Sequence, residues 1–251
     1  MPKEIRIIAI EGLPEFKPGI DLAPLVLQAA QAQGTPLEEG DIVVVTQKVV
    51  SKMEGSLVDL STVTPSPLAE LWAKTYDRDP RVIEVALGES RRISRMANGV
   101  LITETKHGFY CVNAGVDASN VAGAMVALLP KDSDASADRI REGIHRAAGL
   151  RVAVVITDTW GRPWRDGVLN VAIGSSGIPV LLDYRGLKDP YGYELSATVI
   201  AVVDELAAAA ELVMGKLDKV PVAIVKGYKY TPSNTAKVHD MIRPPEMDLY
   251  R

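Results

Sequence analysis

The strongest constraint on this chain is a short apolar run, VAVVI at residues 152–156, that ends directly in polar residues. The run is rich in β-branched side chains and does not alternate with polar ones, which predicts a buried strand. Thr157, Asp158 and Thr159 follow at its C-terminal end. A rigid strand therefore delivers one carboxylate and two hydroxyl groups to the same place.

We expect a tight loop after this strand, because glycine and proline punctuate residues 161–167. The loop carries Arg162 and Arg165, whose guanidinium groups can pair with a phosphate or a carboxylate through two hydrogen bonds each. We assign both arginines as substrate contacts on this chemistry. The alternative is that Asp166 binds one of them in a salt bridge.

Partly alternating strand and helix patterns, interrupted by hairpins, predict a mixed α/β or α+β fold. No glycine- and serine-rich linker and no repeat divides the chain, so residues 1–251 are expected to form one catalytic unit whose lobes interlock. Expected strands are 5–10, 41–50, 100–103, 109–112 and 221–225; expected helices are 21–33, 66–76, 80–96, 136–148 and 194–214.

Composition excludes several classes of protein. A net charge of −4 and a pI near 5.5 argue against a general binder of nucleic acid or anionic membranes. Cys111 is the only cysteine, so no intramolecular disulfide can form, and we interpret it as a small core residue. No uncharged run approaches membrane-spanning length, and we expect a cytoplasmic protein.

Familiar nucleotide and zinc motifs are missing from the sequence. It has no G-x-x-x-x-G-K-[ST] loop, no G-x-G-x-x-G after a strand and no H-E-x-x-H. The three histidines lie far apart, so zinc chemistry is not expected. Oxygen ligands instead favour magnesium or manganese.

Two loops offer such oxygen ligands. Asp158 lies in one, and Asp117, followed by Ser119 and Asn120, lies in the other. Two carboxylates together with nucleotide phosphates make a good magnesium site, because this ion takes few protein ligands. The alternative for each aspartate is a helix cap or a turn. Lys52 is a candidate phosphate contact, or else a solvated lysine at the end of a strand.

Six segments in one order resemble the coenzyme F-420-0:gamma-glutamyl ligase family across essentially the whole chain: 12–14 (GLP), 43–55 (VVVTQKVVSKMEG), 113–120 (NAGVDASN), 156–165, 189–195 (DPYGYEL) and 212–216 (LVMGK). The resemblance implies a GTP- and divalent-metal-dependent ligase that adds L-glutamate to F-420-0. The first glutamate joins the phospholactyl carboxylate through its amino group, and the next is linked through the gamma-carboxyl. It also implies a two-lobed α/β subunit without a P-loop that forms a homodimer.

The resemblance assigns roles to individual residues. Asp117 and Asp158 match ligands of a first Mg²⁺ or Mn²⁺, and Thr159 matches a ligand of a second; K⁺ is a further candidate ion. Lys216 stands where some members carry an acidic ligand of the second metal. In this chain the second ion is then bound by phosphates and Thr159, or Asp218 takes the place of the acidic ligand. Guanine-nucleotide contacts are Leu13, Pro14, Glu15, Phe16, Gln47, Lys48, Lys52, Asn120, Met214, Gly215, Lys216, Leu217, Asp218, Lys219 and Val220.

Two rival interpretations remain open at this point. One is a GTP-binding regulatory protein that keeps the pocket without catalysis. The other is a related amide ligase with a different acidic acceptor. Product analysis with the F-420-0 acceptor would separate all three.

Overall fold

A computed structural model describes residues 3–119, 121 and 123–248, and its centre is a five-stranded sheet in the order β1-β12-β2-β8-β9. Only β2 and β8 pair in parallel; the other neighbours are antiparallel. The prediction of a mixed α/β fold is confirmed. The strands are β1 (Arg6–Ile10), β12 (Val222–Lys226), β2 (Ile42–Thr46), β8 (Ala153–Arg162) and β9 (Arg165–Ser176).

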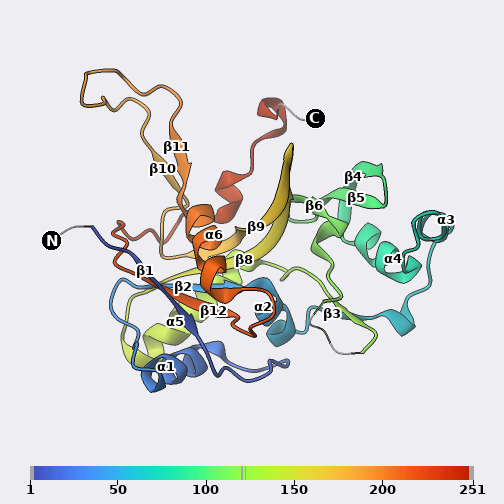
Figure 1. Ribbon diagram of the computed structural model, residues 1–251, viewed down its shortest axis with the longest axis horizontal. Coiled ribbons are helices and arrows are strands. Elements are labelled where there is room, and N and C mark those ends of the chain that lie inside the picture. The colour runs from blue at the N-terminus through green and yellow to red at the C-terminus, as the bar shows by residue number, and fades with distance from the viewer. Residues whose placement is uncertain (1–2, 120, 122, 249–251) are drawn as a thin grey trace.

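Helices cover both faces of this sheet (Figure 1). On one face α1 (Leu22–Ala32) and α5 (Ser133–Ala148) pack on Val154 and Ile156, and on the other α6 (Val202–Met214) packs on Ala153 and Val155. These four strand residues are all 0% exposed, which confirms the buried strand. A strand buried on both faces gains apolar contacts from every side chain, so it needs no alternation.

A smaller hydrophobic cluster lies beside the main sheet, under α3 (Pro67–Tyr76) and α4 (Pro80–Gly88). It packs against the antiparallel sheet β4 (Ser90–Ala97), β5 (Val100–Thr105) and β6 (Tyr110–Val112). A short ladder, β3 (Leu57–Asp59) with β7 (Met125–Ala127), runs between the two parts. That the chain acts as one catalytic unit of interlocked lobes stays a prediction.

Two predicted elements on the N-terminal side are wrong in extent. The expected strand 41–50 ends at Thr46, and α2 (Gln47–Glu54) follows at once. Helical spacing puts Val49, Val50 and Met53 against the core, and Gly55 ends the helix in a left-handed conformation. The expected helix 80–96 stops at Gly88, and its second half is strand β4.

Two further predicted elements, in the second half of the chain, are also wrong. Residues 161–167 form no loop: β8 and β9 continue to a turn at 163–164 and make one long hairpin. The expected helix 194–214 begins only at Val202, because the preceding residues form β11 (Val199–Ala201), which pairs with β10 (Leu181–Asp183). Helix α5 also begins earlier than expected, at Ser133 with Asp132 as its cap. No helix in the described part of the chain is long and apolar enough to cross a bilayer.

Gly174 allows the first turn of α5 to lie directly on β9. A Cβ atom at this position would stand 2.4 Å from the backbone carbonyl carbon and oxygen of Ser133. We therefore expect Gly174→Ala to lower the free energy of unfolding by about 1–3 kcal/mol, as overpacking does. Urea denaturation would measure the loss. Gly161→Ala on β8 is the matched control, because its Cβ would meet nothing within 4 Å; equal stability of the two variants would contradict the prediction.

Candidate active site

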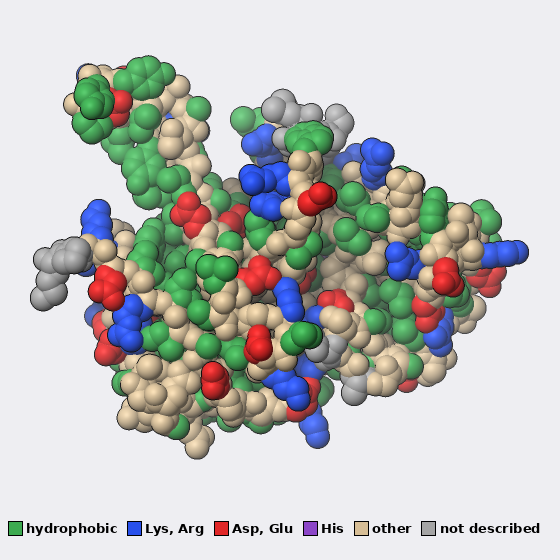
Figure 2. Space-filling view, viewed as in Figure 1, with side chains coloured by type: hydrophobic (Ala, Val, Ile, Leu, Met, Phe, Trp, Pro, Cys, Tyr) green, Lys and Arg blue, Asp and Glu red, His purple; other side chains and the backbone are tan. Residues whose placement is uncertain are grey.

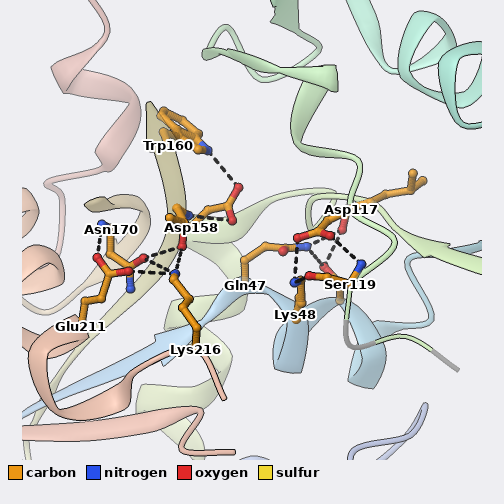
Figure 3. A network of polar contacts seen from close by, with 12 residues as sticks. Gln47, Lys48, Asp117, Ser119, Asp158, Trp160, Asn170, Glu211 and Lys216 are labelled. Carbon is orange, nitrogen blue, oxygen red and sulfur yellow. Dashed lines mark hydrogen bonds and ion pairs between the residues drawn. The ribbon is translucent and has the colours of Figure 1, made fainter. Parts of the chain in front are cut away.

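The site lies where the parallel strands β2 and β8 end side by side. Their register pairs Thr46 with Thr157, so α2 begins at Gln47 beside Asp158. Ligands in α/β proteins bind outside the carboxyl ends of such strands. Figure 3 shows two polar groups at this edge, one around Asp117 and one around Lys216, with Asp158 drawn between them.

Asp117 belongs to the first group. It comes from the turn after β6, where it forms a β-bridge with Ala127. Its Oδ2 lies 2.6 Å from Lys48 Nζ, and its Oδ1 accepts a hydrogen bond from Ser119 N at 2.6 Å. Burial disfavours the charged carboxylate, but the hydrogen bonds from Lys48 and Ser119 outweigh it, so the pKa of Asp117 lies below its ordinary value. Asp117 is ionised at neutral pH.

Asp158 has a different electrostatic environment. Its Oδ2 accepts from Trp160 Nε1 at 2.9 Å and its Oδ1 from Thr159 N at 2.8 Å, but no cation pairs with it within the described residues. Burial raises the pKa of the Asp158 carboxyl, and the negative charge of Asp117 raises it further. A carboxylate held in this way is stabilised by a nearby positive charge.

These two aspartates fit a divalent cation. Both offer oxygen atoms, and the negative charge of Asp117 disfavours the charge of Asp158, an effect that a nearby cation would reverse. No cluster of three or more His, Cys, Asp or Glu side chains that could bind a metal occurs among the described residues. Two carboxylates are a donor set that suits an ion such as Mg²⁺, which takes one or two carboxylates and completes its shell with phosphate and water oxygens.

Thr159 lies on the opposite face of β8, because successive strand residues alternate. Its hydroxyl donates to Asn170 Oδ1 at 2.6 Å, and it also contacts the Lys216 ammonium group. Glu211 Oε1 pairs with Lys216 Nζ at 2.8 Å, while Glu211 Oε2 accepts from Asn170 N at 2.8 Å. A lysine cation is thus held among oxygen atoms of three side chains.

Sequence reasoning missed Asn170 and Glu211. A turn at 163–164 alone would pair Thr159 with Val168; the register shift between Gly161 and Arg162 places Asn170 opposite Thr159 instead, and no sequence signal marked that shift. Nothing local marks Glu211, which faces the site only because α6 crosses β9. Trp160 packs on Phe109 at 5.3 Å between ring centroids, and its Nε1 also donates to Asp158 Oδ2.

The remaining predicted nucleotide contacts divide into two neighbourhoods. On the α2 side Lys52 pairs with Glu15, and Leu13 and Phe16 pack on the core. Gln47 is 2% exposed, with Nε2 donating to Leu128 O and Ser51 Oγ, both at 2.6 Å.

After α6, Met214 and Val220 are buried and frame an exposed turn that contains Lys216. Asn120 lies outside the described residues. The nucleotide contacts as such stay predictions, and the remaining members of the set are Pro14, Lys48, Gly215, Leu217, Asp218 and Lys219.

Arg162 and Arg165 are not beside Asp158. They face each other across the end of the β8–β9 hairpin, four residues beyond Asp158 along β8, which corresponds to roughly 13 Å of extended strand. Arg162 Nη2 donates to the backbone oxygen of Asp166 at 3.2 Å, and no ion pair joins them to Asp166 in the described residues. Their role as substrate contacts stays a prediction.

Cys111 is 5% exposed, and burial raises the pKa of its thiol to about 12. The thiol is therefore protonated at neutral pH and cannot act as a nucleophile. The interpretation of Cys111 as a core residue is confirmed.

Comparison with known proteins identifies the family of this chain. The family model described as F420-0:Gamma-glutamyl ligase matches residues 12–227. A protein named Coenzyme F420:L-glutamate ligase from Methanothermobacter thermautotrophicus is 42% identical over 98% of this chain and 99% of its own length. The protein of the same name from Methanocaldococcus jannaschii is 42% identical over 99% of this chain and 98% of its own length. One from Methanopyrus kandleri is 44% identical over 97% of this chain and 98% of its own. The chain therefore belongs to the F420-0:gamma-glutamyl ligase family.

Proposed function

We propose that this protein is a GTP- and divalent-metal-dependent ligase that adds L-glutamate to F-420-0 and then a gamma-linked glutamate. One observation supports the proposed metal and nucleotide dependence: Asp117 and Asp158 both lie at the edge where β2 and β8 end (Figure 3), and Lys48 pairs with Asp117. The names of the relatives support the glutamate and F420 part.

The proposed chemistry passes through an acyl phosphate. An oxygen of the acceptor carboxylate attacks the γ-phosphorus of GTP, the bond to the β–γ bridging oxygen breaks, and GDP leaves. The glutamate amine then attacks the activated carbonyl carbon, phosphate departs with the bonding electrons, and the nitrogen loses its extra proton. Asp117 and Asp158 would hold the cation, which neutralises phosphate charge, and Lys48 and Lys52 would contact the nucleotide.

We also propose that Lys216 supplies a second, built-in positive charge. Its Nζ contacts Thr159 Oγ1, lies 2.8 Å from Glu211 Oε1 and lies 3.5 Å from Asn170 Oδ1. Oxygen donors of this kind also suit a metal ion, and here the ammonium group takes that position. On this proposal Thr159 orients a lysine, and Asp218 is not required as a substitute metal ligand.

The direct test combines GTP, Mg²⁺ or Mn²⁺, glutamate and F-420-0, with mass spectrometry of the product. Glutamate-sized mass increments accompanied by GDP release support the ligase. Tight GTP binding without product supports the regulatory alternative. Product formed only with another acidic acceptor supports the related ligase.

Homodimerisation is proposed to proceed through the arm at residues 181–201. The arm stands clear of the body in Figures 1 and 2 and exposes hydrophobic side chains, with Tyr191 96% and Tyr193 67% exposed. Large exposed apolar groups favour a partner surface. We expect Tyr191→Asp combined with Tyr193→Asp to convert a dimer to a monomer in light scattering. Leu71→Asp on α3, 66% exposed in the wild type, is the control. A monomeric wild type, or a dimeric double variant, would refute the arm interface.

A further inference from the structure

A cavity of about 540 Å³ opens on the α5 side of the central sheet, and the site described above does not use it. It is bounded by the first turn of α5, the β5–β6 turn and the 3₁₀ turn Val238–Met241. Its volume lies in the range of small-molecule pockets. Four basic side chains line it: Arg91, Lys106, Lys131 and Lys237.

Three carboxylates also line the cavity, but each is already engaged. Asp132 caps α5 by accepting from Ala135 N at 2.9 Å. Asp134 accepts from backbone N–H groups of β9 and of Val238, at 2.8 and 3.1 Å. Asp138 binds Lys237 Nζ at 2.7 Å. These contacts hold the acids to the walls of the cavity through Oδ1 of Asp132, Oδ1 of Asp134 and Oδ2 of Asp138.

Hydrogen-bond donors without an acceptor among the described residues are grouped at residues 131–134. Ser133 is 5% exposed, and its hydroxyl has no hydrogen-bond partner among the described residues. Ser133 N and Asp134 N begin a 16-residue helix, where the first backbone N–H groups have no partner within the helix. Lys131 is exposed and forms no ion pair within the described part of the chain. Hydroxyl, helix N-terminus and ammonium group together are the donors that bind a phosphate.

His107 further narrows the class of ligand. Its Nε2 lies 2.9 Å from Pro130 O, so Nε2 carries a proton, and Nδ1 is buried without a partner. In the neutral ring Nδ1 accepts a hydrogen bond. A phosphate ester with a neighbouring hydroxyl group would therefore satisfy both the donors at 131–134 and the acceptor on His107.

The cavity lies next to the reacting centre. Phe109 lines it and packs on Trp160, which donates to Asp158. Ile173 lines it as well, two residues along β9 from Val171, the strand partner of Asp158; that spacing corresponds to about 7 Å. One aromatic pair, Phe109 and Trp160, therefore separates the cavity from Asp158.

We propose that this cavity binds the phosphate group of the acceptor molecule, with Lys131, Ser133 and the N-terminus of α5 holding the anion. The acceptor carboxylate then extends past Phe109 and Trp160 toward Asp158, where it is phosphorylated. The identity of the acceptor as a phospholactyl compound rests on the proposed function. Inorganic phosphate has the same anion chemistry and serves as a probe that does not depend on that function.

The test is Lys131→Glu, with Ser133→Ala as a second variant and Lys74→Glu on α3 as the matched control. We expect KM for F-420-0 to rise about tenfold in Lys131→Glu, as for loss of one charge-assisted hydrogen bond, while KM for GTP stays within about twofold. Lys131→Arg should retain most of the affinity. Circular dichroism checks that each variant is folded.

The outcomes separate this proposal from the proposed function. An unchanged KM for F-420-0 in both variants overturns it, and so does an equal rise in KM for GTP, which would assign the cavity to the nucleotide. If the wild type does not turn over F-420-0, the proposed function fails, and inorganic phosphate is titrated instead by ³¹P NMR. Phosphate binding that is lost in Lys131→Glu and kept in Lys74→Glu supports an anion site; no difference between the variants overturns it.

Discussion

Asp158→Asn is expected to lower GTP-dependent turnover about a thousandfold, because a metal-ligand carboxylate contributes to about 4 kcal/mol of transition-state stabilisation. Asparagine keeps the shape of the side chain and can still accept from Trp160 Nε1, so the hydrogen bond of 2.9 Å has a counterpart in the variant. What it loses is the charge and one acceptor, because its amide nitrogen cannot accept from Thr159 N as Oδ1 does in the wild type. Steady-state kinetics at saturating GTP and manganese would measure the loss.

The same substitution should not destabilise the metal-free protein. Burial raises the pKa of Asp158 in the folded state. When the pKa of a carboxyl is raised in the folded state, the protein loses stability as the pH rises from the ordinary pKa through the raised value. At neutral pH the charge of this carboxyl is therefore unfavourable for folding. Asparagine removes that charge, which offsets the loss of the hydrogen bond from Thr159 N, and we expect a melting temperature close to that of the wild type.

Metal binding supplies the second measurement. On the proposed metal site, Mn²⁺ should raise the melting temperature of the wild type by linkage, whereas the Asp158→Asn protein should gain much less. Asp166→Asn on the same hairpin is the control, since Asp166 is exposed and uses its backbone oxygen for Arg162. A normal manganese shift and normal turnover in Asp158→Asn would remove this residue from the metal site.

The sequence predicted the parts of the fold that local patterns determine. Residues 152–156 are buried as expected, Asp21 caps α1, and Ser66 caps α3 with proline at the first helical position. These features depend on side chains within a few positions of one another. The hairpin 100–112 also follows from local alternation and its turn.

The predictions that were wrong concern segments whose structure depends on contacts with distant parts of the chain. Residues 47–50 are β-branched or polar and read as a continued strand, yet they become helical because Val49 and Val50 pack beneath the site against the α1 side of the core. The pKa of Asp158 is raised first by burial and then by Asp117, which lies 41 residues earlier in the chain and forms an isolated bridge with Ala127. The cluster around Lys216 needs α6 to cross β9, and no sequence period encodes that crossing.

Lys216→Met is expected to reduce turnover about a hundredfold, the loss typical of removing one preorganised electrostatic donor. Methionine has a similar length without the charge, so Thr159, Asn170 and Glu211 would face one another without a cation. The Lys216 side chain is 53% exposed, and an ion pair this exposed contributes little to folding, about 0–1 kcal/mol. The variant should therefore be folded, and the loss should appear in kcat. Lys74→Met on α3 is the matched control.

Lys216→Glu gives the sharper test of a built-in cation. It places a second carboxylate beside Glu211, whose Oε1 lies 2.8 Å from the ammonium group in the wild type. Two carboxylates and the Thr159 hydroxyl form an oxygen set that suits a divalent ion. We expect this variant to be nearly inactive at low manganese and to recover activity at high manganese, with a steeper metal dependence than the wild type. Activity of Lys216→Met within twofold of the wild type, or a Lys216→Glu variant that manganese does not rescue, would show that Lys216 does not substitute for a metal ion.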